Sequence, residues 1–142
     1  FVTQGATTLP EYWDMKRSQN HAMMGHIKEW FGRHLVGISP ITPGYKEFVI
    51  KPYIPEGLAY AEASVGSAYG TIYAEWNYIE GESITMNVNI PVGCVANIYV
   101  PNCLEAVHEV TVNGKVVITD KKNGYEKIMN AGSGEYVIKS SL

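Results

Sequence analysis

The feature that most constrains the fold is a series of short runs in which apolar and polar residues alternate, filling the chain after residue 40. The clearest run covers 84–90, where every even position is apolar and every odd position is Thr or Asn. A period of two is that of a β-strand with one buried face and one solvated face. A second run, 70–78, places Ile72, Ala74 and Trp76 on the inward side in the same way. The chain after residue 40 is therefore expected to consist of strands.

Turn residues separate these runs at regular intervals. Asn113–Gly114 is the strongest hairpin signal, because this dipeptide accepts the two positive φ values of a type I′ turn. The segment 131–134 joins the last two runs, which we expect to pair with each other. Eight or nine short strands predict a mainly β chain folded as an antiparallel β-sandwich. The expected strands are Tyr45–Pro52, Leu58–Val65, Gly70–Tyr78, Ile84–Ile90, Cys94–Val100, Val107–Val112, Lys115–Thr119, Tyr125–Met129 and Tyr136–Lys139.

Composition excludes several classes of protein. A chain of 142 residues that is 46% hydrophobic and 18% charged has the material for a packed core and is not a disordered tail. Its net charge of −3 gives no electrostatic reason to expect nucleic acid or an anionic membrane as a partner. Cys94 and Cys103 allow either one disulfide or two buried thiols. The first residue is Phe1, so we expect the chain not to begin where its gene does.

One helix is expected before the strands, from Asn20 to Val36. Ser18 or Asn20 can cap its start, and Gly37 is well placed just past its end. Gly25 and Gly32 lie seven apart on the face away from the apolar stripe. Either another backbone approaches the helix there, which would require helical neighbours from outside this chain, or the two glycines are merely tolerated. The apolar stripe consists of Met23, Met24, Ile27, Trp30, Phe31, Leu35 and Ile38.

The loop before this helix is the best candidate for chemistry. Glu11 and Asp14 flank Tyr12 and Trp13, and His21 follows at the start of the helix. A carboxylate beside a Trp suits sugar chemistry, since the ring stacks on a pyranose and the apolar surroundings adjust the pKa of the carboxyl group. From spacing alone a structural alternative is favoured, in which Glu11 caps a helix or forms a salt bridge and Trp13 is buried.

Other kinds of site are not expected. His21, His26 and His34 are spaced by five and eight residues, which spreads them around the helix instead of forming a metal site. The chain carries no Gly-x-Ser-x-Gly motif of a serine hydrolase. Tyr and Trp residues on the strands can stack on sugars, although in alternating strands such residues more often lie in the core.

A set of unusual short motifs recurs in order along the chain. They are Gly5–Thr8, Glu11, Trp13–Asp14, Ser18, Asn20–His21, Met23, Gly25, Glu29–Trp30, Gly37–Ile38, Pro40, Pro43–Lys46, Ser67, Tyr69–Gly70, Trp76 and Val112–Gly114. In these residues the sequence resembles the C-terminal end of bacterial α-L-rhamnosidases of glycoside hydrolase family 78. The resemblance covers nearly the whole chain, and its first half is the more specific part.

The resemblance implies two parts. Residues 1–40 would be the terminal loop and helix of an (α/α)6 catalytic barrel, a remnant of that barrel in this chain. Residues 41–142 would be the C-terminal β-sandwich. The implied partners are rhamnosyl glycosides and the missing N-terminal barrel of the same protein. Together with the composition and the residue spacing above, the resemblance leads us to expect no cofactor, metal, nucleic acid or membrane.

The resemblance also implies roles for four residues. The family removes terminal α-L-rhamnose with inversion, which needs two carboxyl groups roughly 6.5–9.5 Å apart. Glu11 matches the general base, His21 and Trp13 match residues of the sugar pocket, and Asp14 is expected to bind substrate with them. The general acid of the family lies upstream, so we expect this chain alone to be inactive. The alternatives are a non-catalytic carbohydrate-binding or structural β-sandwich module, or a domain that only packs against a barrel or a second subunit.

Overall fold

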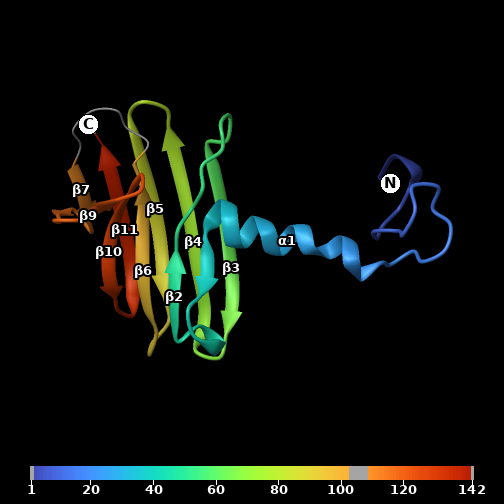
Figure 1. Cartoon of the computed structure of the whole chain (residues 1–142), viewed down its shortest axis with the longest axis horizontal. Helices are drawn as coiled ribbons and strands as arrows, with labels where there is room; N and C mark the ends of the chain where they lie inside the picture. The colour runs from blue at the N-terminus through green and yellow to red at the C-terminus, as the bar shows by residue number, and fades with distance from the viewer. Residues whose placement is uncertain (1, 103–108, 142) are drawn as a thin grey trace. The chain divides into compact units, whose positions relative to one another are not determined.

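The computed structural model describes residues 2–102 and 109–141 and divides into two compact units, Phe1–Phe31 and Gly32–Leu142. The second unit holds the strands of the described residues, which form two sheets (Figure 1). Sheet A has the order β1-β2-β6-β10-β9, and sheet B has the order β3-β4-β5-β11-β7-β8. Sheet A consists of β1 (Ile38–Pro40), β2 (Glu47–Ile50), β6 (Val95–Pro101), β10 (Tyr125–Ala131) and β9 (Asp120–Lys122). Sheet B consists of β3 (Tyr60–Ser67), β4 (Gly70–Ile79), β5 (Ser83–Ile90), β11 (Gly134–Ser141), β7 (Glu109–Val112) and β8 (Lys115–Val116).

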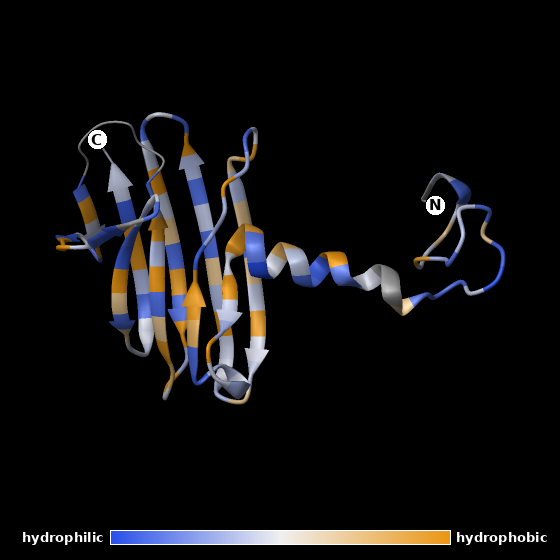
Figure 2. Cartoon of the chain, in the orientation of Figure 1, coloured by the Kyte–Doolittle hydropathy of each residue, from blue (hydrophilic) through white to orange (hydrophobic). Residues whose placement is uncertain are grey.

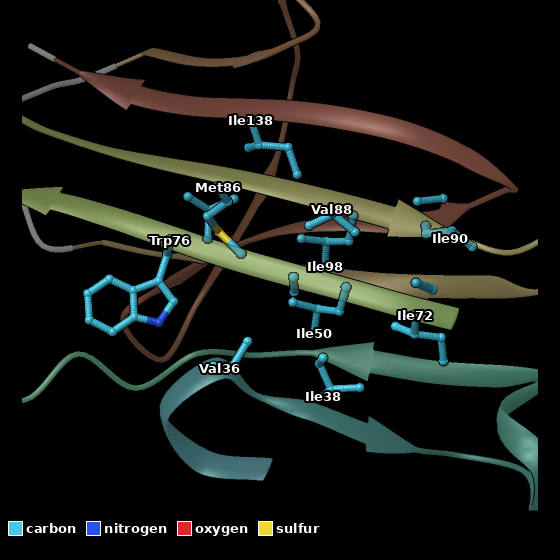
Figure 3. Close-up of a cluster of buried hydrophobic side chains, with 14 of the residues drawn as sticks. Val36, Ile38, Ile50, Ile72, Trp76, Met86, Val88, Ile90, Ile98 and Ile138 are labelled. Atoms are coloured by element: carbon cyan, nitrogen blue, oxygen red, sulfur yellow. The ribbon is translucent and has the colours of Figure 1, made fainter. Parts of the chain in front are cut away.

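Both sheets bury one face in a common core. Along β5 the even positions 84–90 are buried and the odd positions are half-buried, which confirms the period of two in the sequence. Bands of opposite hydropathy alternate along the strands in Figure 2. Ile50 and Ile98 of sheet A meet Ile72, Trp76 and Ile138 of sheet B in this core (Figure 3). The mainly β sandwich expected from the sequence is therefore confirmed.

Strand pairing departs from the sequence-based expectation at the end of the chain. β10 and β11 do not pair with each other, because β10 pairs with β6 and β9 whereas β11 pairs with β5 and β7. The short connection between them crosses from one sheet to the other. The sandwich also contains one parallel pair, β2 with β6, in which Phe48 lies opposite Ala96.

Several boundaries also differ. The short strands β1 and β9 were not expected, and β2 and β8 are shorter than predicted. The Asn113–Gly114 turn is confirmed, with φ values of 50° and 76°. Cys94 is a buried free thiol, whereas Cys103 lies outside the described residues, as do positions 107 and 108 of the expected strand Val107–Val112.

The helical segment ends as expected and begins later than expected. It runs through a 3₁₀ turn (Ala22–Gly25), α1 (His26–Trp30) and a π-helical turn (Phe31–Val36). The expected start at Asn20 and its side-chain cap are wrong. His21 is extended, with φ −94° and ψ 102°, and no side chain caps the first turn. The reason is that the backbone N–H of His21 is bonded to the Leu9 carbonyl, 2.8 Å away, and so belongs to the preceding loop.

The end of the helical segment is held on the sandwich by main-chain geometry. Gly37 has φ +86°, and its carbonyl accepts the N–H of Lys51 at 3.0 Å. The indole N–H of the fully buried Trp76 donates to the Leu35 carbonyl at 2.8 Å. The carbonyl of His34 accepts one further N–H, 3.0 Å away, from the segment after β2. The C-terminal turn of the helical segment is thus an integral part of the second unit.

Candidate active site

The loop that carries the candidate residues is closed on itself by hydrogen bonds. The N–H of Glu11 donates to the Ser18 carbonyl at 2.8 Å, and the N–H of His21 donates to the Leu9 carbonyl at 2.8 Å. Met15 and Arg17 turn the chain between them with φ values of 58° and 63°. Residues ten apart in sequence are brought to the same end of the loop by this closure.

Glu11 and His21 lie close together as a result. The His21 Nδ1 atom is 3.9 Å from the Glu11 Oε2 atom, and 29% of each side chain is exposed. That distance is too long for a direct hydrogen bond and lies within the 4 Å reach of an ion pair when the imidazole is protonated. The pair offers a carboxylate that is reachable from solvent and a neighbouring group that can donate or accept a proton.

The structure places Trp13 and Asp14 at the exposed tip of the same loop. Trp13 is 81% exposed, so the structural alternative in which this ring is buried is wrong. One oxygen of Asp14 accepts the N–H of Lys16 at 3.1 Å, and the other lies 3.3 Å from the Lys16 ammonium. The carboxylate of Asp14 therefore helps to hold the turn. Sequence reasoning missed the guanidinium of Arg17, which lies 5.2 Å from the centre of the Tyr12 ring.

Apolar side chains of the first unit remain exposed on the helical segment. Ile27, Trp30 and Phe31 are 53%, 45% and 47% exposed, and the rings of Trp30 and Phe31 meet edge to face at 5.7 Å. Apart from the neighbouring residues and the backbone of the same helical turns, no atom of the described chain lies within 4 Å of a Cβ built at Gly25 or Gly32. Within the described residues, therefore, neither glycine is in contact with another backbone.

A second polar cluster lies on the solvent face of sheet B. The hydroxyl of Tyr73 contacts the carboxylates of Glu62, at 2.9 Å, and Glu75, while the amide of Asn87 donates to Glu75. Hydrogen bonds from Tyr60 and Tyr73 lower the pKa of Glu62, and the bond to Glu62 raises the pKa of Tyr60 to about 12. These groups bond mainly to one another across β3, β4 and β5.

Among the described residues, no group of three His, Cys, Asp or Glu side chains is arranged to hold a metal ion. Within the same part of the chain, no helix is long and apolar enough to cross a membrane.

Comparison with known families assigns most of the sandwich to a family of C-terminal domains. Residues 37–116 match the family described as bacterial alpha-L-rhamnosidase C-terminal domain, and residues 1–35 match the bacterial alpha-L-rhamnosidase 6 hairpin glycosidase domain. The chain belongs to the bacterial α-L-rhamnosidase family, of which it represents the C-terminal region. This confirms the resemblance found in the sequence.

Individual relatives agree with this assignment. An α-L-rhamnosidase of Formosa agariphila is 31% identical over 158 aligned positions, which cover 99% of this chain and 17% of that protein. The structure of alpha-L-rhamnosidase from Dictyoglumus thermophilum superimposes with a TM-score of 0.86 at 24% identity, over 99% of this chain and 17% of that chain. Streptomyces avermitilis alpha-L-rhamnosidase, solved in complex with L-rhamnose, gives a TM-score of 0.80 at 23% identity, over 97% of this chain and 14% of that chain. The chain thus spans about a sixth of the length of these relatives, and the two structures support the fold alone.

Proposed function

We propose that this chain is the C-terminal part of an inverting glycoside hydrolase that removes terminal α-L-rhamnose from glycans or glycosides. In this proposal residues 1–40 complete an (α/α)6 catalytic domain, and residues 41–142 form the β-sandwich that follows it. The match of residues 1–35 to a six-hairpin glycosidase domain supports this division, since it stops next to the end of the helical segment at Val36.

The exposed apolar residues of the helical segment also support a larger protein. A helix in water normally turns its apolar stripe toward a core. Ile27, Trp30 and Phe31 are each about half exposed in the described chain. The upstream catalytic domain of the same protein, packed against this stripe, is the partner that the proposal requires.

The proximity of Glu11 and His21 carries the proposed mechanism. In an inverting hydrolase a carboxylate takes a proton from water as the water oxygen attacks the anomeric carbon, and a second carboxyl group protonates the leaving oxygen. We assign the first role to Glu11, whose carboxylate is partly exposed and lies 3.9 Å from His21. His21 would bind a sugar hydroxyl or support the charge of the base. The general acid would come from the upstream domain.

Trp13 and Asp14 would complete the sugar pocket. The exposed ring of Trp13 offers an apolar wall for the hydrophobic face of a pyranose. The carboxylate of Asp14 still has lone pairs beyond those engaged by Lys16, so it can accept a hydrogen bond from a sugar hydroxyl.

The test is the reaction of the protein together with its upstream domain on an aryl α-L-rhamnoside, followed by ¹H NMR. Release of L-rhamnose with the β-anomer appearing first is the expected result, because a water activated by Glu11 attacks from the face opposite the leaving group. Initial release of the α-anomer, or hydrolysis of other aryl glycosides but not of rhamnosides, would contradict the proposal.

A further inference from the structure

We propose that the solvent face of sheet A carries a second sugar-binding site, separate from Glu11, which takes one 6-deoxyhexose unit. A hollow of about 290 Å³ lies there, lined by Glu47 of β2, Val95 and Asn97 of β6, and Asn130 of β10. Its volume lies just below the range of about 300–1,000 Å³ that is typical of ligand pockets, which suits a ligand of a single small ring. We call it the sheet A hollow.

Strand register places these side chains on one face. Glu47 lies opposite Val95 in the parallel pair of β2 and β6. The next residue on each strand is buried in the core, so Glu47 and Val95 lie on the opposite, solvent-facing side of the sheet. β10 contributes through an irregularity between Ile128 and Ala131, where Asn130 adopts φ +53°. Such bulges redirect side chains and are common beside functional sites. The bulge interrupts the regular alternation of inward and outward side chains along β10 and places the polar residue Asn130 at the rim of the hollow.

The polar groups of the hollow have hydrogen-bonding capacity to spare. Within the described residues, the carboxylate of Glu47 and the side-chain amide of Asn130 make no hydrogen bond. The Oδ1 atom of Asn97 accepts the N–H of Asn130 at 3.3 Å, which leaves the Asn97 amide nitrogen available. Asparagine amides both donate and accept, as sugar hydroxyls do, and a carboxylate accepts from two hydroxyls at once. This set of groups suits a neutral polyhydroxylated ligand.

Val95 gives the hollow its preference for a deoxy sugar. It is the apolar member of the lining, and 37% of it is exposed. A methyl group on the sugar ring would cover this surface, whereas a hydroxymethyl group would bury a hydroxyl against it without a partner, at a free-energy cost.

The neighbouring surface limits the site to one sugar unit. Tyr99 follows Asn97 on the same face, about 6.6 Å further along β6. The ammonium groups of Lys51 and Lys127 lie 5.4 Å and 5.1 Å from the centre of its ring. Because these cations compete for its faces, the ring is a poor platform for a second pyranose. We therefore expect a single shallow subsite with a dissociation constant of about a millimolar.

The test is a titration of the ¹⁵N-labelled 142-residue chain with L-rhamnose, read by amide chemical shifts. Saturable shifts should map to Glu47, Val95, Asn97 and Asn130. Asn97→Ala should weaken binding about tenfold, because it removes one good hydrogen bond to the ligand. Asn77→Ala, an exposed asparagine of sheet B, should leave it unchanged.

Two further outcomes are decisive. L-Mannose, which differs from L-rhamnose by a 6-hydroxyl group, should bind several-fold more weakly, and equal binding would overturn the role given to Val95. Shifts that do not saturate, or that map to sheet B, would overturn the site itself. The readout is binding to the sandwich, so loss of hydrolysis in a Glu11 variant has no bearing on it.

Discussion

Gly37 joins the helical segment to the sandwich, and a single methyl group added there should be unusually damaging. A Cβ at this position would lie 2.1 Å from the carbonyl carbon of Lys51 and 2.5 Å from the nitrogen of Pro52. Carbon atoms in contact normally stay about 3.5–4.0 Å apart. The backbone after β2 must therefore move by more than 1 Å in Gly37→Ala, roughly the difference between those distances.

The expected cost of Gly37→Ala has two parts. A non-glycine residue at φ +86° costs about 1–2 kcal/mol through its backbone conformation. Displacing Lys51 also breaks its 3.0 Å bond to the Gly37 carbonyl and strains the adjacent 3.0 Å bond between Tyr53 and His34, at about 1 kcal/mol each. The free energy of unfolding should therefore fall by about 3–4 kcal/mol.

Gly57→Ala is the matched control. Gly57 has φ +79°, and nothing lies within 4 Å of a Cβ built there, so only the conformational cost of about 1–2 kcal/mol applies. Urea unfolding followed by tryptophan fluorescence measures both variants, since Trp76 is fully buried. Equal losses of stability in the two variants would refute the argument that close packing fixes this junction.

Two further predictions concern the surface of sheet B. Asn113→Ala should lower the free energy of unfolding by about 1 kcal/mol more than Asn123→Ala does. Both asparagines occupy turns at φ near +50°, but only the Asn113 side chain accepts a hydrogen bond from β11, donated by the N–H of Val137 at 2.8 Å. Equal unfolding midpoints of the two variants in urea would contradict this. The pKa of Tyr60 is raised from 10.0 to about 12, so the folded chain keeps a proton that the unfolded chain loses, and stability should fall as the pH rises between these values. Glu62→Gln should lower the pKa of Tyr60, and a tyrosinate absorbance titration that matches the parent chain would show this explanation to be wrong.

The β-sandwich was largely predictable because its signal is local. Alternation along 84–90 and the Asn113–Gly114 turn each specify a structure from a few adjacent residues. Pairing between distant strands carries no such local signal. The crossing between β10 and β11 is decided by which sheet buries each strand, and so the expected pairing of these two strands was wrong. Short edge strands such as β1 and β9 are too brief to show a period.

The sequence proposes residues for the candidate site but does not predict their geometry. Glu11 and His21 are ten residues apart. Neither a helix nor a strand would bring their side chains together, because ten residues span about 15 Å in a helix and about 33 Å in a strand. They come close because two backbone hydrogen bonds close the loop, one donated by the N–H of Glu11 to the Ser18 carbonyl and one donated by the N–H of His21 to the Leu9 carbonyl. Every residue type has these backbone groups, so they leave no signal in the sequence. The exposure of Trp13 likewise depends on the loop conformation. The amino-acid composition of the loop therefore could not predict whether this ring is buried or exposed.

The proposed role of Glu11 is tested most directly by the rate at which Glu11→Gln hydrolyses an aryl α-L-rhamnoside, in the protein that carries its upstream domain. Glutamine keeps the shape of the side chain and cannot accept a proton from water. Loss of a general base lowers the rate by about 100- to 10,000-fold, and we predict a loss in this range. Glu56→Gln, which removes an exposed carboxylate from the sandwich, should keep full activity. Activity of Glu11→Gln within a few-fold of the parent enzyme would contradict the account.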